Sequence, residues 1–155
     1  FRAGDAAGRL VHQQHAGFQR QRHGDVGQLA RPLVQRAGRC VGQVQEAVGS
    51  MGIEEGLACI CVAHCTCAVY VNEYERGLVA DVLRLIEEIT THREWQHDRI
   101  DDNAQAHLGA IAIGNSLTMP VTDSTVELAT WQRILLVELD GPRQRNVLVS
   151  VVADR

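Results

Sequence analysis

The sequence predicts an α+β domain, in which helices pack on one face of an antiparallel β-sheet or sandwich. Three observations lead to this prediction. A chain of 155 residues is long enough for one domain with a substantial core. Residues 75–89 carry apolar side chains at helical spacing. Several β-prone runs follow, and turn residues separate them.

The composition argues against several classes of protein. Hydrophobic residues make up 45% of the chain and charged residues 22%, as in ordinary soluble domains. No apolar run approaches the roughly 18 residues of a membrane span, and no signal peptide opens the sequence, so we expect a cytoplasmic protein without a membrane partner. The net charge of −4 does not favour a nucleic-acid partner. All fifteen basic residues are arginine, which excludes a Schiff-base lysine and a P-loop lysine.

Residues 1–40 differ in character from residues 41–155, which we interpret as the folded domain. The segment up to Arg39 holds seven arginines and two acidic residues, is rich in Gln, Gly and His, and shows no sustained periodicity. One interpretation is a disordered basic arm. Another is a shifted reading frame, because the chain opens on Phe1 and GC-rich DNA translated out of frame gives sequences rich in Arg, Gly, Gln and His. Of the two, we favour the shifted frame.

The first regular elements follow this segment. Residues 44–56 predict a short helix that is closed by glycine and has Val44 and Val48 on one face. The run 57–72 is strongly β-prone, and residues 75–89 predict an amphipathic helix. Residues 91–105 are polar and show no regular period.

Three further strands are expected in residues 106–121, 126–140 and 146–154. Turn-forming residues separate them, and we expect residues 122–124 and 140–143 each to link a hairpin. The resulting order of helix, strand, helix and then several antiparallel strands is typical of the α+β class.

The strand expected over residues 59–72 places its side chains alternately on two faces. Its four cysteines, at positions 59, 61, 65 and 67, fall on one face. Neighbouring thiols would lie about 6.8 Å apart and point in parallel, whereas zinc needs sulfurs converging at about 2.3 Å. We therefore interpret these cysteines as buried free thiols, and the odd total of five also argues against a disulfide framework. His64 falls on the opposite face, where apolar side chains give way to polar ones.

One polar loop concentrates groups that bind metal ions or transfer protons. Its members are His97, Asp98, Asp101, Asp102, Asn103 and His107. Together with His64, its two histidines would make a three-histidine metal site with an open fourth position. The alternative is a solvated acidic loop followed by a helical turn that Asp102 or Asn103 caps.

Two further segments carry candidate ligand-binding residues. Trp131 and Gln132 precede a very apolar strand, and the sequence leaves open whether Trp131 packs in the core or stacks on a ligand. Arg143 and Arg145 follow a turn and suit a phosphate group through charge-assisted hydrogen bonds. The alternative is that both arginines are solvated turn residues.

Five segments, taken in order, resemble the YjbQ family, also called secondary thiamine-phosphate synthases. They are HCTCAVYVNE from residue 64, DDNAQAHL from residue 101, SLTMPV from residue 116, ATWQRILLVELDGPR from residue 129 and RNVLVSVV from residue 145. The resemblance covers roughly residues 44–152. Cys65, Cys67 and Ala129 depart from the usual Thr, Ala and Gly, and residues 1–39 do not read as the family's β-rich first segment.

The resemblance implies a YjbQ-like α+β fold with an antiparallel sheet, and a homotrimer. It also implies a divalent-metal site, with zinc or magnesium as the cofactor, at His64, His97 and His107. The remaining matched motif positions, which we expect to be catalytic, are Glu73, Asp102, Asn103, Trp131 and Gln132.

The activity implied by the resemblance is thiamine-phosphate synthesis, a metal-assisted joining of a pyrimidine diphosphate to a thiazole phosphate. In this hypothesis Arg143 or Arg145 contacts phosphate and Trp131 stacks on a ring, so the partner is a phosphorylated small molecule. Two alternatives stay open. One is a non-catalytic trimer that binds a metal or ligand, and the other is a metal-dependent enzyme that acts on another phosphorylated small molecule.

Overall fold

A computed structural model of the chain describes residues 11–17, 36–91 and 94–154. In this part of the chain the helices are α1 (Val41–Ser50), α2 (Arg76–Thr90) and α3 (Ala104–Ile113), with a 3₁₀ turn η1 (Gln96–Arg99). The strands are β1 (Val11–Gly17), β2 (Arg36–Arg39), β3 (Gly56–Val62), β4 (Cys67–Glu73), β5 (Ser116–Thr122), β6 (Thr125–Val126), β7 (Gln132–Glu138) and β8 (Asn146–Ala153). The predicted α+β class is confirmed.

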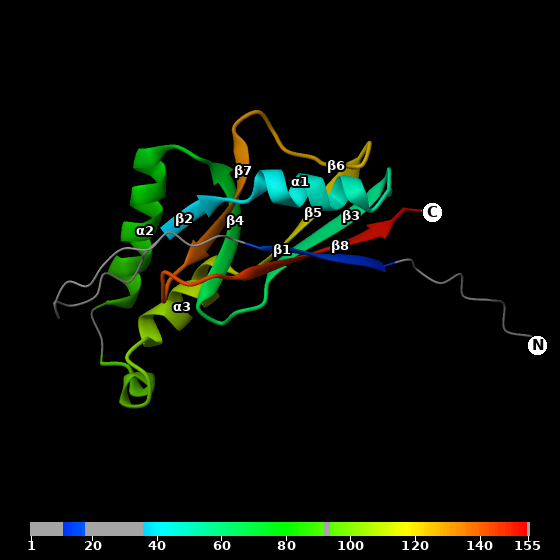
Figure 1. Cartoon of the computed structure of the whole chain (residues 1–155). Helices are drawn as coiled ribbons and strands as arrows, with labels where there is room; N and C mark the ends of the chain where they lie inside the picture. Colours follow the sequence, from blue (N-terminus) through cyan, green and yellow to red (C-terminus); the bar gives the residue numbers. More distant parts are fainter. Residues whose placement is uncertain (1–10, 18–35, 92–93, 155) are drawn as a thin grey trace, which may run out of the picture.

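The strands form two antiparallel sheets. The larger has the order β1-β8-β3-β5-β6 and the smaller the order β2-β7-β4. Figure 1 shows α1 lying across the larger sheet, while α2 and α3 lie beside the smaller one. The chain changes sheets several times, and two of the crossings are short: β3 of the larger sheet leads to β4 of the smaller, and β7 of the smaller leads to β8 of the larger. These two crossings lie next to each other, because Cys67 at the start of β4 pairs with Glu138 at the end of β7.

The main hydrophobic core lies between the two sheets and α1. Strand alternation supplies it, since every second residue of β3 is buried, beginning at Ala58. Fully buried members of this core are Val44, Val48, Ile60, Val62, Val69, Ile134, Val147 and Val149. These strands and α1 therefore form the rigid framework of the domain.

A second, smaller core joins α3 to the other face of the smaller sheet. It consists of Ala68, Ala106, Ala110, Val137 and Leu139. Gly109 allows this close approach, because a Cβ at this position would lie 2.8 Å from Ile86 Cγ2 of α2 and 3.0 Å from Leu139 Cδ1. The smaller sheet is thus covered on both faces, and α3 is held against the end of β7.

The helix expected over residues 75–89 is confirmed as α2, whereas the one expected over residues 44–56 begins earlier, at Val41, and already ends at Ser50. Helix α1 buries Val44, Ala47 and Val48, which follow helical spacing. Helix α2 begins where the Glu75 carboxylate accepts hydrogen bonds from the backbone N–H groups of Gly77 and Leu78, at 2.7 and 2.8 Å. Such a cap satisfies donors that the first helical turn leaves free.

The strand expected over residues 106–121 is wrong in its first half, which forms α3. This run is short, alanine-rich and apolar on all sides, so periodicity does not distinguish a buried helix from a buried strand. Gly114 ends the helix at φ 101°, a backbone conformation that favours glycine. Strand β5 begins only at Ser116.

The single strand expected over residues 59–72 is also wrong, because it is two strands in different sheets. A turn at residues 63–66 divides them, with hydrogen bonds from His64 N to Val62 O and from Cys67 N to His64 O. The predicted alternation therefore does not continue from Cys61 to Cys67. His64 lies in the turn and not on a strand face.

The two predicted hairpin turns have different outcomes. Residues 122–124 do link the β5–β6 hairpin, with Asp123 and Ser124 at φ 50° and 58°. Such left-handed pairs match the twist of a hairpin. Residues 140–143 do not link a hairpin, because β7 and β8 belong to different sheets.

Two strands lie within residues 1–40, where no strand was expected. Strand β1 pairs with β8 along the edge of the larger sheet, and β2 pairs with β7. The proposed division at residue 40 and the shifted frame stay predictions, and residues 1–10 and 18–35 lie outside the described residues. No helix in the described part of the chain is long and apolar enough to cross a membrane.

Candidate functional site

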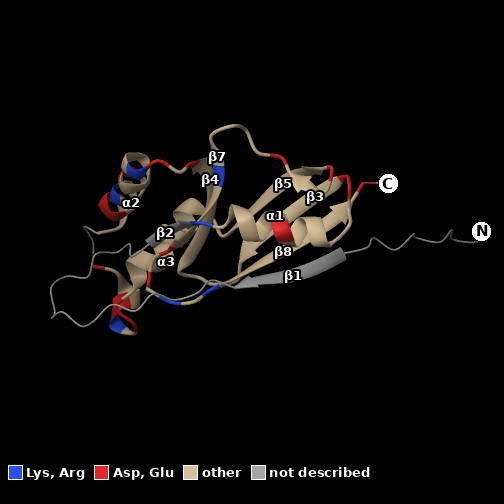
Figure 2. Ribbon diagram, turned by 45° about the horizontal axis from the view of Figure 1, so that its top comes forward, with Lys and Arg blue, Asp and Glu red and all other residues tan. Residues whose placement is uncertain are grey.

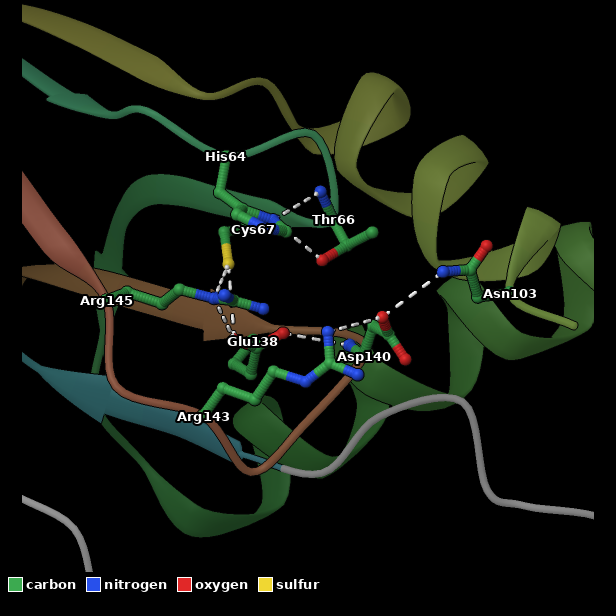
Figure 3. Close-up of polar contacts among 8 residues, drawn as sticks. All are labelled: His64, Thr66, Cys67, Asn103, Glu138, Asp140, Arg143 and Arg145. Carbon is green, nitrogen blue, oxygen red and sulfur yellow. Dashed lines mark hydrogen bonds and ion pairs between the residues drawn. The ribbon is translucent and has the colours of Figure 1, made fainter. Parts of the chain in front are cut away.

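A cluster of polar side chains lies where the short β3–β4 and β7–β8 crossings meet the start of α3. Three segments supply it: the turn before β4 with the first residue of that strand, the last residue of β7 with the chain that leads to β8, and the residue that precedes α3. Figure 3 shows these side chains pointing toward one another. The labelled members are His64, Thr66, Cys67, Asn103, Glu138, Asp140, Arg143 and Arg145.

Arg145 and Glu138 form a buried ion pair at the centre of this cluster. Their side chains are only 11% and 7% exposed. The Arg145 Nε–H donates to Glu138 Oε2, and it also lies 3.1 Å from the sulfur of Cys67. Burial acts to lower the pKa of Arg145, but the hydrogen bond and charge of Glu138 outweigh it and raise that pKa. One edge of the guanidinium is therefore fixed, while Nη2 is buried without a hydrogen-bond partner in the described structure.

The backbone around Glu138 fixes this carboxylate in turn. Its second oxygen, Oε1, accepts a hydrogen bond from the Asp140 N–H at 2.9 Å. Gly141 packs directly against it, since a Cβ there would lie 2.5 Å from Glu138 Cγ and 2.6 Å from Arg143 N. Glycine at this turn therefore allows the loop to close over the ion pair.

Asp140 links the outer part of the cluster to α3. Its Oδ2 accepts from Asn103 Nδ2 at 3.2 Å and pairs with Arg143 Nη1 at 3.2 Å. The Arg143 side chain is more than half exposed, so its guanidinium lies at the mouth of the cluster. The amide oxygen of Asn103 is buried and has no partner among the described residues.

His64 sits on the other side of Cys67 from the ion pair. Its Nδ1 lies 3.2 Å from the backbone N of Thr66 and 3.0 Å from the Thr66 hydroxyl. Desolvation lowers the pKa of His64, and the positive charge of Arg145 lowers it further. The lowered pKa favours a neutral imidazole at neutral pH.

His97 and His107 form a pair that the sequence predicted to share a site. Their rings meet edge to face with centroids 4.7 Å apart, and His97 Nε2 is buried without a partner in the described structure. Two imidazoles on one zinc, with Zn–N of about 2.0–2.1 Å, have ring centres roughly 5 Å apart. The pair therefore offers two imidazoles of the kind that bind a divalent metal, and the unpartnered amide oxygen of Asn103 lies one helical turn before His107 in the sequence.

The structure does not gather the three predicted metal histidines in one group. Within the described residues of this chain, no three His, Cys, Asp or Glu side chains are placed to hold a metal ion. His64 is hydrogen-bonded to Thr66, whereas the rings of His97 and His107 contact each other. The three-histidine site therefore stays a prediction.

Three of the predicted catalytic residues lie at the opposite end of the same sheet. Glu73 pairs with Gln132 at one end of the β4–β7 ladder, and Cys67 pairs with Glu138 at the other. Six residues of strand at about 3.4 Å each separate the two ends by roughly 20 Å. Trp131 is 69% exposed, so it is not an ordinary core tryptophan.

The caps predicted for the polar loop are only partly as expected. Asn103 does occupy the N-cap position of α3, but its side chain makes no capping bond. The carboxylate of Asp98 caps the helix instead, accepting from the Ala104 N–H at 2.9 Å. Asp102 is exposed.

The interpretation of the cysteines as one buried face is wrong. Cys59 and Cys65 are exposed, Cys61 is half-buried, and only Cys67 of this group is buried. Burial and the neighbouring Glu138 carboxylate raise the pKa of Cys67 to about 12. Its thiol is therefore a neutral packing group beside Arg145.

The sequence-based reasoning missed Glu138 and Asp140 as parts of the site. A glutamate inside the apolar run of β7 was the available signal, because a buried carboxylate requires a partner. Figure 2 shows charged residues on α1, on α2 and in the connections, while β3, β5 and β8 carry none.

Comparison with known proteins identifies relatives of this chain. A family model described as "UPF0047 protein YjbQ-like" matches residues 36–154. A UPF0047 protein from Archaeoglobus fulgidus is 43% identical over 111 residues, which cover 71% of this chain and 86% of that protein. A UPF0047 protein from Methanothermobacter thermautotrophicus is 38% identical over 109 residues, covering 70% of this chain and 76% of that protein.

Solved structures are similar to this fold as well. A YbjQ-like protein of unknown function from Sulfolobus solfataricus superposes with a TM-score of 0.79 at 38% identity, covering 94% of this chain and 99% of that one. A hypothetical protein from Aeropyrum pernix gives a TM-score of 0.75 at 35% identity, with the same coverage of 94% and 99%.

Proposed function

The chain belongs to the YjbQ-like UPF0047 family, and from this premise we propose that its polar cluster binds and converts a phosphorylated small molecule. The observation that carries the proposal is the state of Arg145. Its guanidinium is buried and fixed by Glu138, yet Nη2 has no partner in the described structure.

A buried donor without a hydrogen-bond partner, such as Arg145 Nη2, is stabilised when a ligand supplies an acceptor. Leaving a charged donor without a hydrogen bond costs more than about 1–3 kcal/mol, so a bound acceptor would stabilise it. Planar guanidinium groups match phosphate oxygens, and Arg143 adds a second cation at the exposed mouth. A phosphoryl group is therefore the ligand chemistry that suits the cluster.

A divalent metal is part of this proposal. His97 and His107 would hold it, and the Asn103 amide oxygen would be the third donor from this chain. When bound, a divalent ion supplies positive charge to a diphosphate. The Asp98 cap on Ala104 N would orient the start of α3 and so fix Asn103 and His107.

The specific reaction that we propose is thiamine-phosphate synthesis. The C–O bond between the pyrimidine methylene and its diphosphate breaks, and the diphosphate leaves with the electron pair. The thiazole nitrogen then donates its lone pair to the methylene carbon and forms the new C–N bond. In this chain Arg145 and Arg143 would bind the departing diphosphate, which stabilises the charge that develops on it.

Assembly into a homotrimer belongs to the same proposal. Trp131, Gln132 and Glu73 lie roughly 20 Å from Glu138 within one chain, by the rise of about 3.4 Å per strand residue. The exposed Trp131 would complete the site only if it came from a neighbouring copy. Mixing inactive Trp131→Ala and Arg143→Ala proteins tests this, because shared sites in mixed oligomers would regain activity. Light scattering gives the number of copies.

A non-catalytic role as a metal- or ligand-binding protein is the second candidate. The hydrogen bonds of the two carboxylates in the cluster favour it. Glu138 is bound by Arg145 and by the backbone of Asp140, and Asp140 is bound by Arg143 and Asn103. Neither is free to act as a general base in this arrangement. A metal-dependent reaction on another phosphorylated substrate is tested by the same variants with a substrate panel.

The decisive experiment measures product formation from both substrates with Mg²⁺ or Zn²⁺. Arg143→Ala is the informative variant, because its side chain is exposed and its loss leaves the buried pair intact. We expect its activity to fall by roughly 10-fold or more, the size of a charge-assisted hydrogen bond. Arg84→Ala, on the exposed face of α2, is the matched control and should keep full activity. Equal activity in both variants would contradict the assignment.

A further inference from the structure

The turn that precedes β4 fixes which ring nitrogen of His64 carries the proton. The backbone N–H of Thr66 lies 3.2 Å from His64 Nδ1. A backbone N–H is always a donor, so Nδ1 must be the acceptor in this contact. In a neutral imidazole the proton then sits on Nε2. The Thr66 hydroxyl, 3.0 Å from the same nitrogen, donates to it as well in this tautomer.

We propose that His64 is a hydrogen-bond donor to the phosphoryl oxygens of the ligand, acting through its Nε2–H beside Arg145, and not a metal ligand. This assignment rests on the proposed function. It divides the residues of the proposed site into an oxyanion half, which binds phosphoryl oxygens, and a metal half. His64, Arg145 and Arg143 form the oxyanion half. His97 and His107 form the metal half.

The position of His64 supports the oxyanion half. Its carbonyl oxygen accepts from the Cys67 N–H, and the Cys67 sulfur lies 3.1 Å from Arg145 Nε. The imidazole and the guanidinium are therefore held on either side of one residue, and Figure 3 shows them facing the same region. The charged groups that act on His64 are Arg145, Glu138, Arg143 and Asp140.

The same contacts oppose a metal at His64. A protonated Nε2 has no lone pair to give to a metal. Coordination through Nδ1 would displace the Thr66 amide from its acceptor. That amide belongs to a turn that is also fixed by the hydrogen bond from Leu139 N to Thr66 O, at 3.1 Å.

The tautomer is tested first, and without any ligand. Long-range ¹⁵N–¹H correlation spectra of the full chain distinguish a protonated Nε2 from a protonated Nδ1, and a His64→Gln spectrum assigns the signals. We expect the Nε2–H form for His64. A protonated Nδ1 would overturn the assignment directly.

Two conservative variants then separate the oxyanion role from the metal role. In His64→Asn the amide oxygen can replace Nδ1 as acceptor for Thr66, but no donor remains at the place of Nε2. In His64→Gln the amide reaches the place of Nε2 and can still donate. Titration calorimetry with inorganic pyrophosphate in metal-free buffer measures the oxyanion half, and titration with Zn²⁺ alone measures the metal half.

We expect His64→Asn to bind pyrophosphate roughly 10-fold or more weakly, as for a lost hydrogen bond to a charged group, and His64→Gln to stay within about 3-fold. Zinc affinity should be unchanged in both variants and reduced in His107→Ala. Loss of zinc binding in the two His64 variants, or unchanged pyrophosphate affinity in His64→Asn, would overturn the role of His64 alone. If the unsubstituted chain does not bind pyrophosphate, the proposed function falls and this role falls with it.

Discussion

Glu138 and Arg145 form an ion pair that the fold almost completely buries, with Glu138 at the end of β7 and Arg145 just before β8. They lie seven positions apart in the sequence, and the chain between them includes the turn that carries the protein from one sheet to the other. The pair therefore ties the two sheets together at the place where the candidate ligand binds.

Removing one charge of this pair should destabilise the protein strongly. For Glu138→Gln we expect the free energy of unfolding to fall by about 3 kcal/mol, because the buried guanidinium loses its counter-charge. Glu88→Gln is the matched control, since its contact with Arg84 is exposed and should change stability by less than about 0.5 kcal/mol. Urea denaturation measures both. Similar effects in the two variants would show that the buried pair has no special role.

Gly141→Ala should disturb the same pair from the backbone side. The new methyl group would approach Glu138 Cγ and Arg143 N within 2.6 Å, so the loop must shift. We expect a loss of about 1–3 kcal/mol in stability, as for an overpacked core, together with weaker phosphate binding. Gly42→Ala in α1 is the control, because its Cβ would meet nothing within 4 Å. Alanine there should gain up to about 1 kcal/mol. A neutral result at Gly141 would contradict the close packing.

The five cysteines should differ sharply in reactivity. Burial raises the pKa of Cys40 to about 11 and that of Cys67 to about 12, so both stay protonated near neutral pH. The thiolate is the reactive form, and these two residues should be alkylated slowly. Cys59 and Cys65 are exposed and should react first with iodoacetamide. Mass spectrometry of the intact and digested protein measures the order in which the cysteines are alkylated. Rapid labelling of Cys67 in folded protein would contradict the buried site.

The same two thiols predict how stability depends on alkaline pH. Their folded-state pKa values lie above the ordinary value of 9.0. The unfolded chain therefore releases these protons first as the pH rises, so the stabilising effect is complete below about pH 9 and is lost between there and about pH 11–12. Replacing Cys40 and Cys67 by alanine should flatten the decline over this window. The free energy of unfolding, measured at a series of pH values, tests this. If it declines as steeply with pH in the double variant as in the unsubstituted chain, the two thiols are not the cause of the decline.

Zinc should stabilise the protein through His97 and His107. A ligand that binds only the folded state at 100 times its Kd adds about 2.7 kcal/mol to stability. We therefore expect zinc to raise the melting temperature, the chelator EDTA to reverse this, and His97→Ala and His107→Ala each to abolish it. The exposed Asp101→Asn variant is the control and should respond like the unsubstituted chain. A full zinc response in His107→Ala would exclude the pair as the metal site.

Much of the framework followed from local patterns in the sequence. Helices α1 and α2 were predictable because their apolar residues recur at helical spacing. The β5–β6 turn was predictable for the same reason, since its backbone preference resides in two adjacent residues. The position of Arg145 after a turn pointed to phosphate binding, and the resemblance to known family motifs pointed to His64, His97 and His107.

Other features depend on contacts that no local pattern encodes. The run that forms α3 suits a buried helix or strand equally, and only packing of Ala106 and Ala110 on the smaller sheet decides between them. The break between β3 and β4 arises because the chain must change sheets, which alternation along 59–72 does not reveal.

Patterns and motifs in the sequence were sufficient to predict the class of fold, two helices, the family and the residue types available for phosphate and metal binding. How those residues combine depends on the packing of the folded chain. It brings Cys67 beside Glu138 across 71 positions of sequence and leaves Arg145 Nη2 without a partner. It also turns His64 Nδ1 toward the Thr66 amide. The physical reason is that the partner of a buried charge is chosen by packing in three dimensions, where two sheet crossings meet, and not by spacing along the chain.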